Sequence, residues 1–131
     1  MGLIIRNKKT YGNNPLQCLS TNYLTDEQIV GTWIDGKPIY QKTVEFGALP
    51  NKTTKSVAHN IDNLDTVVDY NAVAKRSSDN NNIKLPIVND SSINYQCSCA
   101  IVGANISMES RNVDFSAFVA NVTILYTKTT D

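Results

Sequence analysis

Hydrophobic and polar residues alternate with a period of two along much of this chain. In residues 93–102 the odd positions are apolar as far as Ile101, whereas Asn94, Gln96 and Ser98 between them are polar. The same alternation recurs in residues 64–70 and 117–126. Because successive side chains of a strand point to opposite faces of a sheet, each run predicts a half-buried β-strand.

About eight strand candidates follow one another, separated by Asn, Gly, Asp, Ser and Pro. They are residues 29–34, 38–46, 53–58, 64–70, 83–88, 93–102, 105–109 and 117–126. Short strands at this spacing predict an all-β fold, an antiparallel sandwich or barrel. Pro86 lacks an N–H and so places its segment at a sheet edge. A helical pattern is confined to one possible turn in Leu24–Val30, with Thr25 as its cap.

Two stretches have the composition of irregular structure. Ser77–Asn82 contains no apolar residue, so we expect a mobile, exposed loop. Residues 1–22 are expected to form an arm outside a compact domain of residues 23–131. The apolar residues of this arm require cover from another chain or a larger assembly, and they include Leu3, Ile4, Ile5 and Leu16.

Composition excludes several classes of partner. The chain has 131 residues, a length typical of one domain, and its 12 basic and 12 acidic residues give a net charge of zero. No basic block argues for nucleic-acid binding. The apolar runs are far shorter than the roughly 20 residues that cross a bilayer, and no secretory signal is recognisable. We expect a soluble protein with neither nucleic acid nor membrane as a partner.

The titratable residues do not form a recognisable catalytic or metal-binding pattern. His59 is the one histidine, and no Gly-x-Ser-x-Gly motif accompanies it, so a structural role is favoured over catalysis. Asp62, Asp65 and Asp69 lack the dense spacing of a calcium loop, and solvated positions are favoured over glycosidase chemistry. We expect no cofactor, no metal and no enzymatic activity.

Three cysteines cannot form a complete set of disulfides within one chain. Cys97 and Cys99 are two residues apart in a strand-like run, so they share one face of the strand. Buried thiols are the favoured interpretation. The alternative, a metal pair, lacks a second pair of ligands.

The aromatic residues allow two interpretations. In an all-β domain they serve most often as core or interface anchors. The alternative is a platform on which sugars stack. The residues concerned are Trp33, Tyr40, Tyr70, Tyr95 and Tyr126.

The octapeptide of residues 33–40 predicts a tight hairpin. Asp35-Gly36 lies between two β-prone runs, and Gly accepts the positive φ that such a turn requires. The octapeptide also resembles a hairpin of the distal domains of tailed-bacteriophage fibre proteins. Its sequence is Trp33-Ile34-Asp35-Gly36-Lys37-Pro38-Ile39-Tyr40.

Other segments resemble the same fibre domains in the same order. Residues 23–32 and 41–43 flank the hairpin like the opening of the domain, and residues 47–51 resemble the turn that follows. Residues 57–61 resemble a His-containing strand end, and Tyr126–Asp131 resembles the C-terminal signature. The resemblance covers about residues 20–131.

This resemblance implies a jelly-roll-like β-sandwich knob, usually a homotrimer, on a virion appendage that adheres to host surfaces or caps a fibre. Only about 20 residues precede the knob, so we expect the arm to attach it to other virion proteins. A short head fibre, a decoration protein and a baseplate-tip component then become as plausible as a tail fibre. Association is also favoured because Val30 and Ile34 alternate with Ile29 and Trp33, and one sandwich core covers only one face.

The alternative function is a carbohydrate-binding module that recognises bacterial surface polysaccharide. Its contacts would lie in exposed loops rich in Asn, Asp and Ser, which favour sugar hydroxyls. The candidate loop residues are Asp79, Asn80, Asn81, Asn89 and Asp90. A capsule-degrading enzyme is disfavoured because no acid pair is identifiable.

Overall fold

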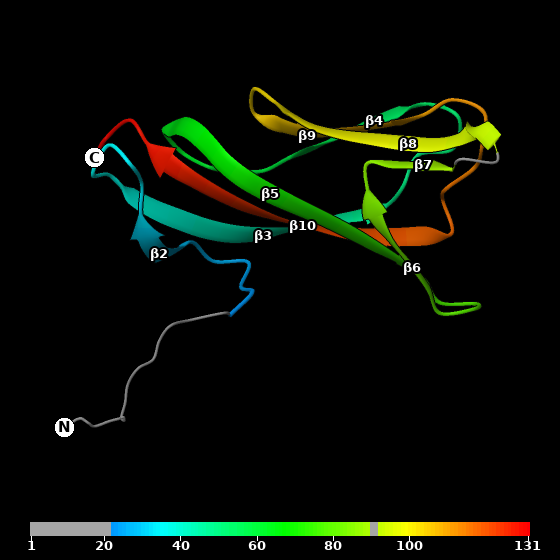
Figure 1. Ribbon diagram of the computed structural model, residues 1–131, viewed down its shortest axis with the longest axis horizontal. Helices are drawn as coiled ribbons and strands as arrows, with labels where there is room; N and C mark the ends of the chain where they lie inside the picture. Colours follow the sequence, from blue (N-terminus) through cyan, green and yellow to red (C-terminus); the bar gives the residue numbers. More distant parts are fainter. Residues whose placement is uncertain (1–21, 90–91) are drawn as a thin grey trace, which may run out of the picture.

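Nine antiparallel strands form two facing sheets in the computed structural model, which describes residues 22–89 and 92–131 (Figure 1). The five-stranded sheet has the order β2 (Gln28–Thr32), β3 (Pro38–Ala48), β10 (Phe118–Lys128), β5 (Leu64–Arg76) and β6 (Asn81–Leu85). The four-stranded sheet has the order β4 (Thr54–Ala58), β9 (Asn105–Ser110), β8 (Ser92–Val102) and β7 (Ile87–Asn89). The prediction of an all-β, antiparallel sandwich is confirmed.

Most strand bounds differ from the expected ones by one or two residues, and two differences are larger. β5 continues to Arg76, because the apolar alternation resumes at Ala72 and Ala74, both of which are buried. The expected segment 83–88 is divided at Pro86 into β6 and β7, and each strand lies at an edge of a different sheet. The edge position predicted for Pro86 is therefore correct, but the chain changes sheet there.

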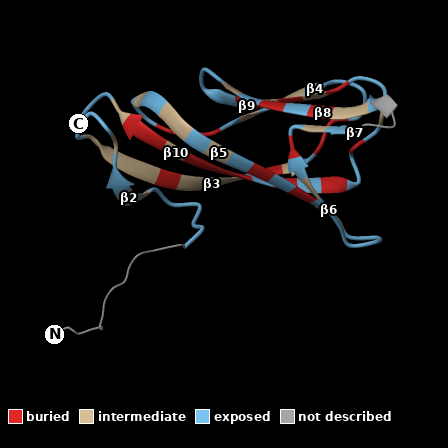
Figure 2. Cartoon of the chain, viewed as in Figure 1, coloured by how far each residue is buried: buried red, intermediate tan, exposed pale blue. Residues whose placement is uncertain are grey.

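The core lies between the sheets and is centred on β10. The alternate residues Ala120, Val122, Ile124 and Tyr126 have no exposed surface, and Figure 2 shows β10 as the most buried strand. Both neighbours of β10, β3 and β5, pair with it in an antiparallel register. The opposite sheet contributes four buried hydrophobic residues, Cys97, Cys99, Ile106 and Met108.

The predicted hairpin joins β2 to β3. Gly36 has a φ of +90°, the conformation for which glycine is suited, and its N–H donates to the Trp33 carbonyl at 2.9 Å. The Trp33 N–H donates to the Lys37 carbonyl at 2.8 Å, and the Lys37 N–H donates to the Asp35 carboxylate at 3.0 Å. Pro38 is the first residue of β3, where a missing N–H is tolerated.

One local prediction is wrong, and a second is correct about exposure but not about the extent of the loop. Residues 24–30 form a bend and the start of β2 rather than a helical turn, because the Leu24 carbonyl accepts the Thr43 N–H at 2.8 Å along the edge of β3. Within Ser77–Asn82 only residues 77–80 form a turn; Asn81 and Asn82 pair with Arg76 and Lys75 as the beginning of β6.

The expected arm falls almost entirely outside the described residues. Leu3, Ile4, Ile5 and Leu16 belong to residues 1–21, and Asp90 is also outside them. Of the expected arm only Asn22 is described, and its carbonyl accepts the Gln41 amide at 2.9 Å.

Candidate functional site

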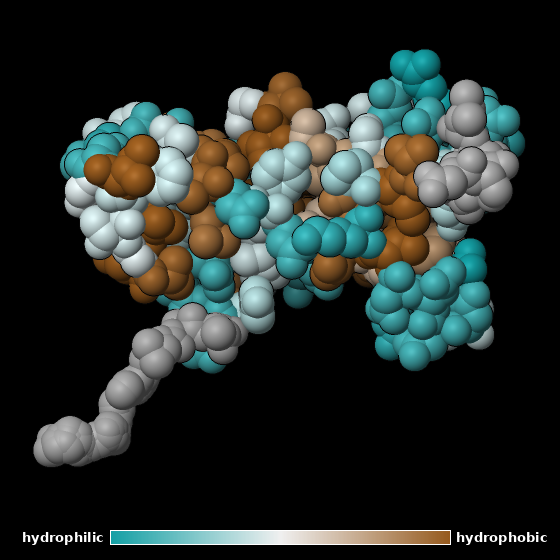
Figure 3. Space-filling view, in the orientation of Figure 1, coloured by the Kyte–Doolittle hydropathy of each residue, from teal (hydrophilic) through white to brown (hydrophobic). Residues whose placement is uncertain are grey.

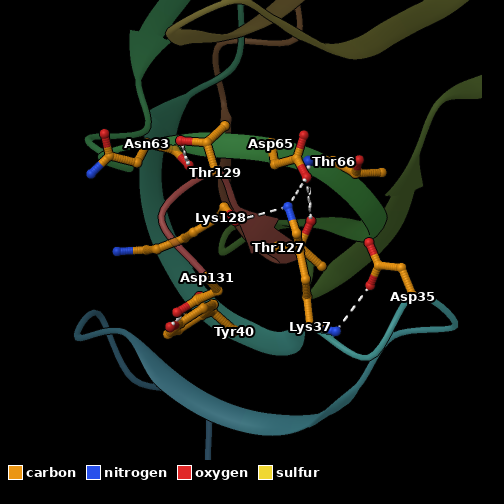
Figure 4. A network of polar contacts seen from close by, with 10 residues as sticks. All are labelled: Asp35, Lys37, Tyr40, Asn63, Asp65, Thr66, Thr127, Lys128, Thr129 and Asp131. Atoms are coloured by element: carbon orange, nitrogen blue, oxygen red, sulfur yellow. Dashed lines mark hydrogen bonds and ion pairs between the residues drawn. The ribbon is translucent and has the colours of Figure 1, made fainter.

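The C-terminal residues lie against the β2–β3 turn and form a polar cluster with it (Figure 4). The Lys37 ammonium donates to Asp65 at 2.8 Å and to the Lys128 carbonyl at 3.3 Å. The Tyr40 hydroxyl donates to Asp131 at 2.6 Å. We name this cluster the hairpin junction; it consists of Glu27, Lys37, Tyr40, Asp65, Tyr126, Thr127, Lys128 and Asp131.

Sheet register explains why these residues meet. Tyr40 and Tyr126 are directly paired across β3 and β10, so their side chains point to the same face, and their rings stack at 5.8 Å between centroids. The Lys128 ammonium lies 5.1 Å from the centroid of the Tyr40 ring. The hairpin brings Lys37 to the start of β5, where Asp65 is located.

The inner part of the hairpin junction is centred on Glu27. Its carboxylate accepts the hydroxyl of the fully buried Tyr126 at 2.5 Å and pairs with the Lys128 ammonium at 2.8 Å. Burial acts to raise the pKa of Glu27, but the hydrogen bonds from Lys128 and Tyr126 outweigh it and lower that pKa. Burial, reinforced by the bond to Glu27, raises the pKa of Tyr126.

The outer part of the hairpin junction is more exposed and is also charge-paired. The hydrogen bond from Lys37 lowers the pKa of Asp65, and the same bond raises the pKa of Lys37. Thr127 also donates to Asp65 at 3.4 Å and accepts the Thr66 N–H at 3.3 Å. The hydrogen bond to Asp131 raises the pKa of Tyr40.

This arrangement binds chain segments to one another. Each carboxylate of Glu27 and Asp65 already has a cation beside it. Within residues 22–89 and 92–131, no three His, Cys, Asp or Glu side chains lie close enough together to hold a metal ion. The hairpin junction therefore fixes the ends of the domain.

His59 has a structural environment. It is 2% exposed, its Nδ1 accepts the Ile61 N–H at 3.1 Å, and its Nε2 lies 2.8 Å from the Gly103 carbonyl. Because Nδ1 accepts the first hydrogen bond, it carries no proton. Nε2 therefore carries the ring proton and donates a hydrogen bond to the Gly103 carbonyl. Both ring nitrogens are thus used to join the turn after β4 to the β8–β9 turn, as the favoured structural interpretation expects.

The buried thiols and aromatic residues are core elements. Burial raises the pKa of Cys97 and of Cys99 to about 11, so both remain thiols at neutral pH. Tyr95 packs against Phe115 at 4.9 Å between ring centroids, and the Tyr70 hydroxyl donates to the Cys99 carbonyl. Tyr126 has no exposed surface, so it is a core residue and cannot stack on a sugar.

The described candidate receptor residues lie in the β5–β6 turn and in strands β6 and β7, and the β5–β6 turn is at the end of the sandwich opposite the C-terminus (Figure 1). In the β5–β6 turn, Asp79 forms a two-bonded ion pair with Arg76 at 2.7 and 3.0 Å, and Asn80 has a φ of +57°. Asn81 pairs with Arg76 in the sheet, whereas Asn89 is the last residue of β7. The Asp79 carboxylate is therefore already bonded within its own turn.

A feature that sequence reasoning missed is a groove on the outer face of the five-stranded sheet. Its volume is about 420 Å³. Its floor consists of two cross-strand rows on β3, β10 and β5: Thr43–Thr123–Asn71 and Glu45–Asn121–Val73. Tyr23 and Thr25, which precede β2, complete the lining. Period-two alternation places these residues on the outer face, but it does not show which strands are neighbours.

Comparisons with known protein families, curated proteins and solved structures found no match. In the described ranges, no helix is long and apolar enough to cross a membrane.

Proposed function

We propose that this chain is a structural protein of a tailed-bacteriophage virion, a short fibre or knob without enzymatic activity that contributes to adhesion to the host surface. It assembles as a homotrimer and is attached to other virion proteins through residues 1–22. Its location is the capsid or the tail, as an appendage. The alternative function is a carbohydrate-binding module that recognises bacterial surface polysaccharide. Such a module would also bind the host surface, but it would not be a component of the virion.

The observation that carries the proposal is the hairpin junction. The two most specific segments of the resemblance, residues 33–40 and 126–131, are far apart in the sequence. In the fold they contact each other through Lys37 and the Lys128 carbonyl, and through Tyr40 and Asp131. Because the two segments contact each other in the fold, a domain of this type is expected to contain both. The presence of both in this chain therefore supports its resemblance to the fibre domains.

The trimer is supported by an exposed apolar edge. Three of the large apolar side chains on or beside β2 are well exposed and do not line the groove: Leu24 at 47%, Ile29 at 63% and Ile34 at 90%. We name these three residues the edge patch. In Figure 3, the end of the molecule that carries the β2–β3 turn shows hydrophobic surface among other hydrophobic areas of this face, whereas the β5–β6 turn is hydrophilic.

The edge patch also adjoins an open strand edge. Within residues 22–89 and 92–131, β2 pairs with β3 alone, so the described chain leaves the other edge of β2 without a strand neighbour. Exposed apolar side chains beside an open strand edge favour association with another chain. Closed rotational symmetry allows identical copies to cover one another's patches.

Two measurements test the proposal. Light scattering on the full-length chain is expected to give three times its 14.5 kDa mass, and Ile29→Asp/Ile34→Asp is expected to yield monomers. Val88→Asp/Val102→Asp, two comparably exposed positions on the other sheet, is the matched control and keeps the trimer. Antibodies against the chain are expected to label intact phage particles, and particles that contain none of the chain would contradict the proposal.

A further inference from the structure

The groove on the outer face of the five-stranded sheet is built from rigid elements. Its two floor rows belong to β3, β10 and β5, and β10 and β5 are interior strands of that sheet. Thr43 and Thr123 are directly paired, and their hydroxyl oxygens lie 2.9 Å apart. Side chains on interior strands are held in place better than side chains on loops, so the floor is preformed for a ligand.

The aromatic wall of the groove is anchored on both sides. Tyr23 lies between Asn22, whose carbonyl accepts the Gln41 amide at 2.9 Å, and Leu24, whose carbonyl accepts the Thr43 N–H at 2.8 Å. Despite these anchors the Tyr23 side chain is 66% exposed. An aromatic ring fixed beside a polar floor, and not covered by the described chain, is available to a ligand.

The floor offers free hydrogen-bonding groups. Within residues 22–89 and 92–131, the side chains of Asn71, Asn121 and Glu45 make no hydrogen bond to protein. All three side chains are exposed in the described chain, so their two amides and one carboxylate can bond to a ligand with hydroxyl groups. Glu45 is the one charged residue among those lining the groove, so the site disfavours acidic ligands.

We propose that this groove binds a neutral saccharide, with one sugar face on the Tyr23 ring and its hydroxyls on Asn71, Asn121 and Glu45. A sugar ring has an apolar C–H face and a rim of hydroxyls, and the groove pairs an aromatic ring and Val73 with amide, hydroxyl and carboxylate groups. This inference deepens the proposed adhesion function and rests on it for the source of the sugar, a glycan of the host surface.

The groove is distinct from the loops favoured by the sequence. The β5–β6 turn lies at one end of the sandwich, and Asp79 there is paired with Arg76. The groove residues instead lie on the outer face of the central strands. Substitutions in the two sets therefore separate the two hypotheses.

The test is a glycan array of neutral and acidic bacterial polysaccharides probed with the full-length chain, followed by calorimetry with an oligosaccharide fragment of each hit. We expect neutral glycans to bind and Asn71→Ala/Asn121→Ala to weaken binding about tenfold or more. Tyr23→Ala is expected to weaken it similarly, whereas Tyr23→Phe retains the ring and the affinity. Asn105→Ala, at an exposed strand position on the other sheet, is the matched control with unchanged affinity.

Several outcomes would overturn the inference. The first is binding of acidic glycans alone, and the second is an affinity that the groove substitutions leave unchanged. The third is a loss of affinity caused by Asp79→Ala/Asn80→Ala and not by the groove substitutions. The fourth is a set of amide NMR shifts at the groove that peptides produce and neutral glycans do not. If antibodies against the chain label virions and any of these results is obtained, saccharide binding at the groove is refuted and the proposed function stands. Neutral-glycan binding by a chain that is absent from virions would refute the function and leave the groove intact.

Discussion

The hydroxyl of Tyr126 donates a 2.5 Å hydrogen bond to the Glu27 carboxylate, joining the last strand of the domain to the segment that precedes its first described strand. Tyr126 has no exposed surface, and Glu27 is also paired with Lys128 at 2.8 Å. The bond is therefore charge-assisted and shielded from water at the tyrosine end. Such bonds contribute more to stability than neutral or exposed ones.

Removal of this hydroxyl is expected to destabilise the domain. Tyr126→Phe leaves the ring packing intact but deprives Glu27 of a donor, and we expect a loss of about 1–2 kcal/mol in the free energy of unfolding. Urea denaturation followed by tryptophan fluorescence measures it. Tyr40→Phe removes the exposed bond to Asp131 and is expected to cost less; equal losses in the two variants would refute the special role of the inner bond.

The ion pairs of the hairpin junction predict a fall in stability in acid. The pKa values of Glu27 and Asp65 are lowered in the folded state from 4.5 and 3.8, so the folded protein holds these protons less tightly than the unfolded chain. Their contribution is complete above the unfolded pKa values and is lost as pH falls through the lower folded values. The midpoint of urea unfolding is expected to decrease below about pH 4.5.

A variant separates this effect from general acid denaturation. Lys37→Met removes the hydrogen bond that lowers the pKa of Asp65, so the stability of the variant is expected to depend less steeply on pH in this range. Lys75→Met, at an exposed position of β5 that forms no ion pair within the described chain, should retain the parent slope. Parallel pH profiles for the parent and Lys37→Met would contradict the linkage.

The alternation of apolar residues predicted most of the strands because strand formation depends on a local period. The run from 93 to 102 and the run from 105 to 109 became β8 and β9 with nearly the expected bounds. The β2–β3 turn was also predictable, since Asp35-Gly36 specifies it locally. The pairing of β10 between β3 and β5 was not, because register across a long sequence separation depends on the assembled core.

The two sites depend on that same nonlocal pairing. Tyr40 and Asp131 are 91 positions apart, and the local alternation around either one gives no sign of the other. The apolar pattern continues through Pro86 and so predicts one strand where the fold has two. The groove required knowledge that Asn71 and Asn121 lie on neighbouring strands, so the sequence directed attention to the polar loops instead.

The buried thiols are expected to be unreactive in the folded protein. The pKa of about 11 for Cys97 and Cys99 leaves little thiolate near pH 8, and both side chains are buried. In a Cys18→Ser background, Ellman's reagent should report almost no thiol in the native state and two thiols per chain in urea. Rapid modification of either cysteine in the native protein would contradict the burial.

The turn at Asp35-Gly36 provides a further test, with a matched control on the same hairpin. Gly36 has a φ of +90°, which an L-residue adopts only with strain, although a Cβ there would meet nothing within 4 Å. Gly36→Ala is expected to reduce the free energy of unfolding by about 1 kcal/mol through backbone strain alone. Gly31 does not have a positive φ, and a Cβ there would meet Ile39 at an ordinary 3.9 Å. Gly31→Ala is therefore expected to leave stability unchanged or slightly increased, and a larger loss at Gly31 than at Gly36 would show that the turn conformation does not hold the hairpin.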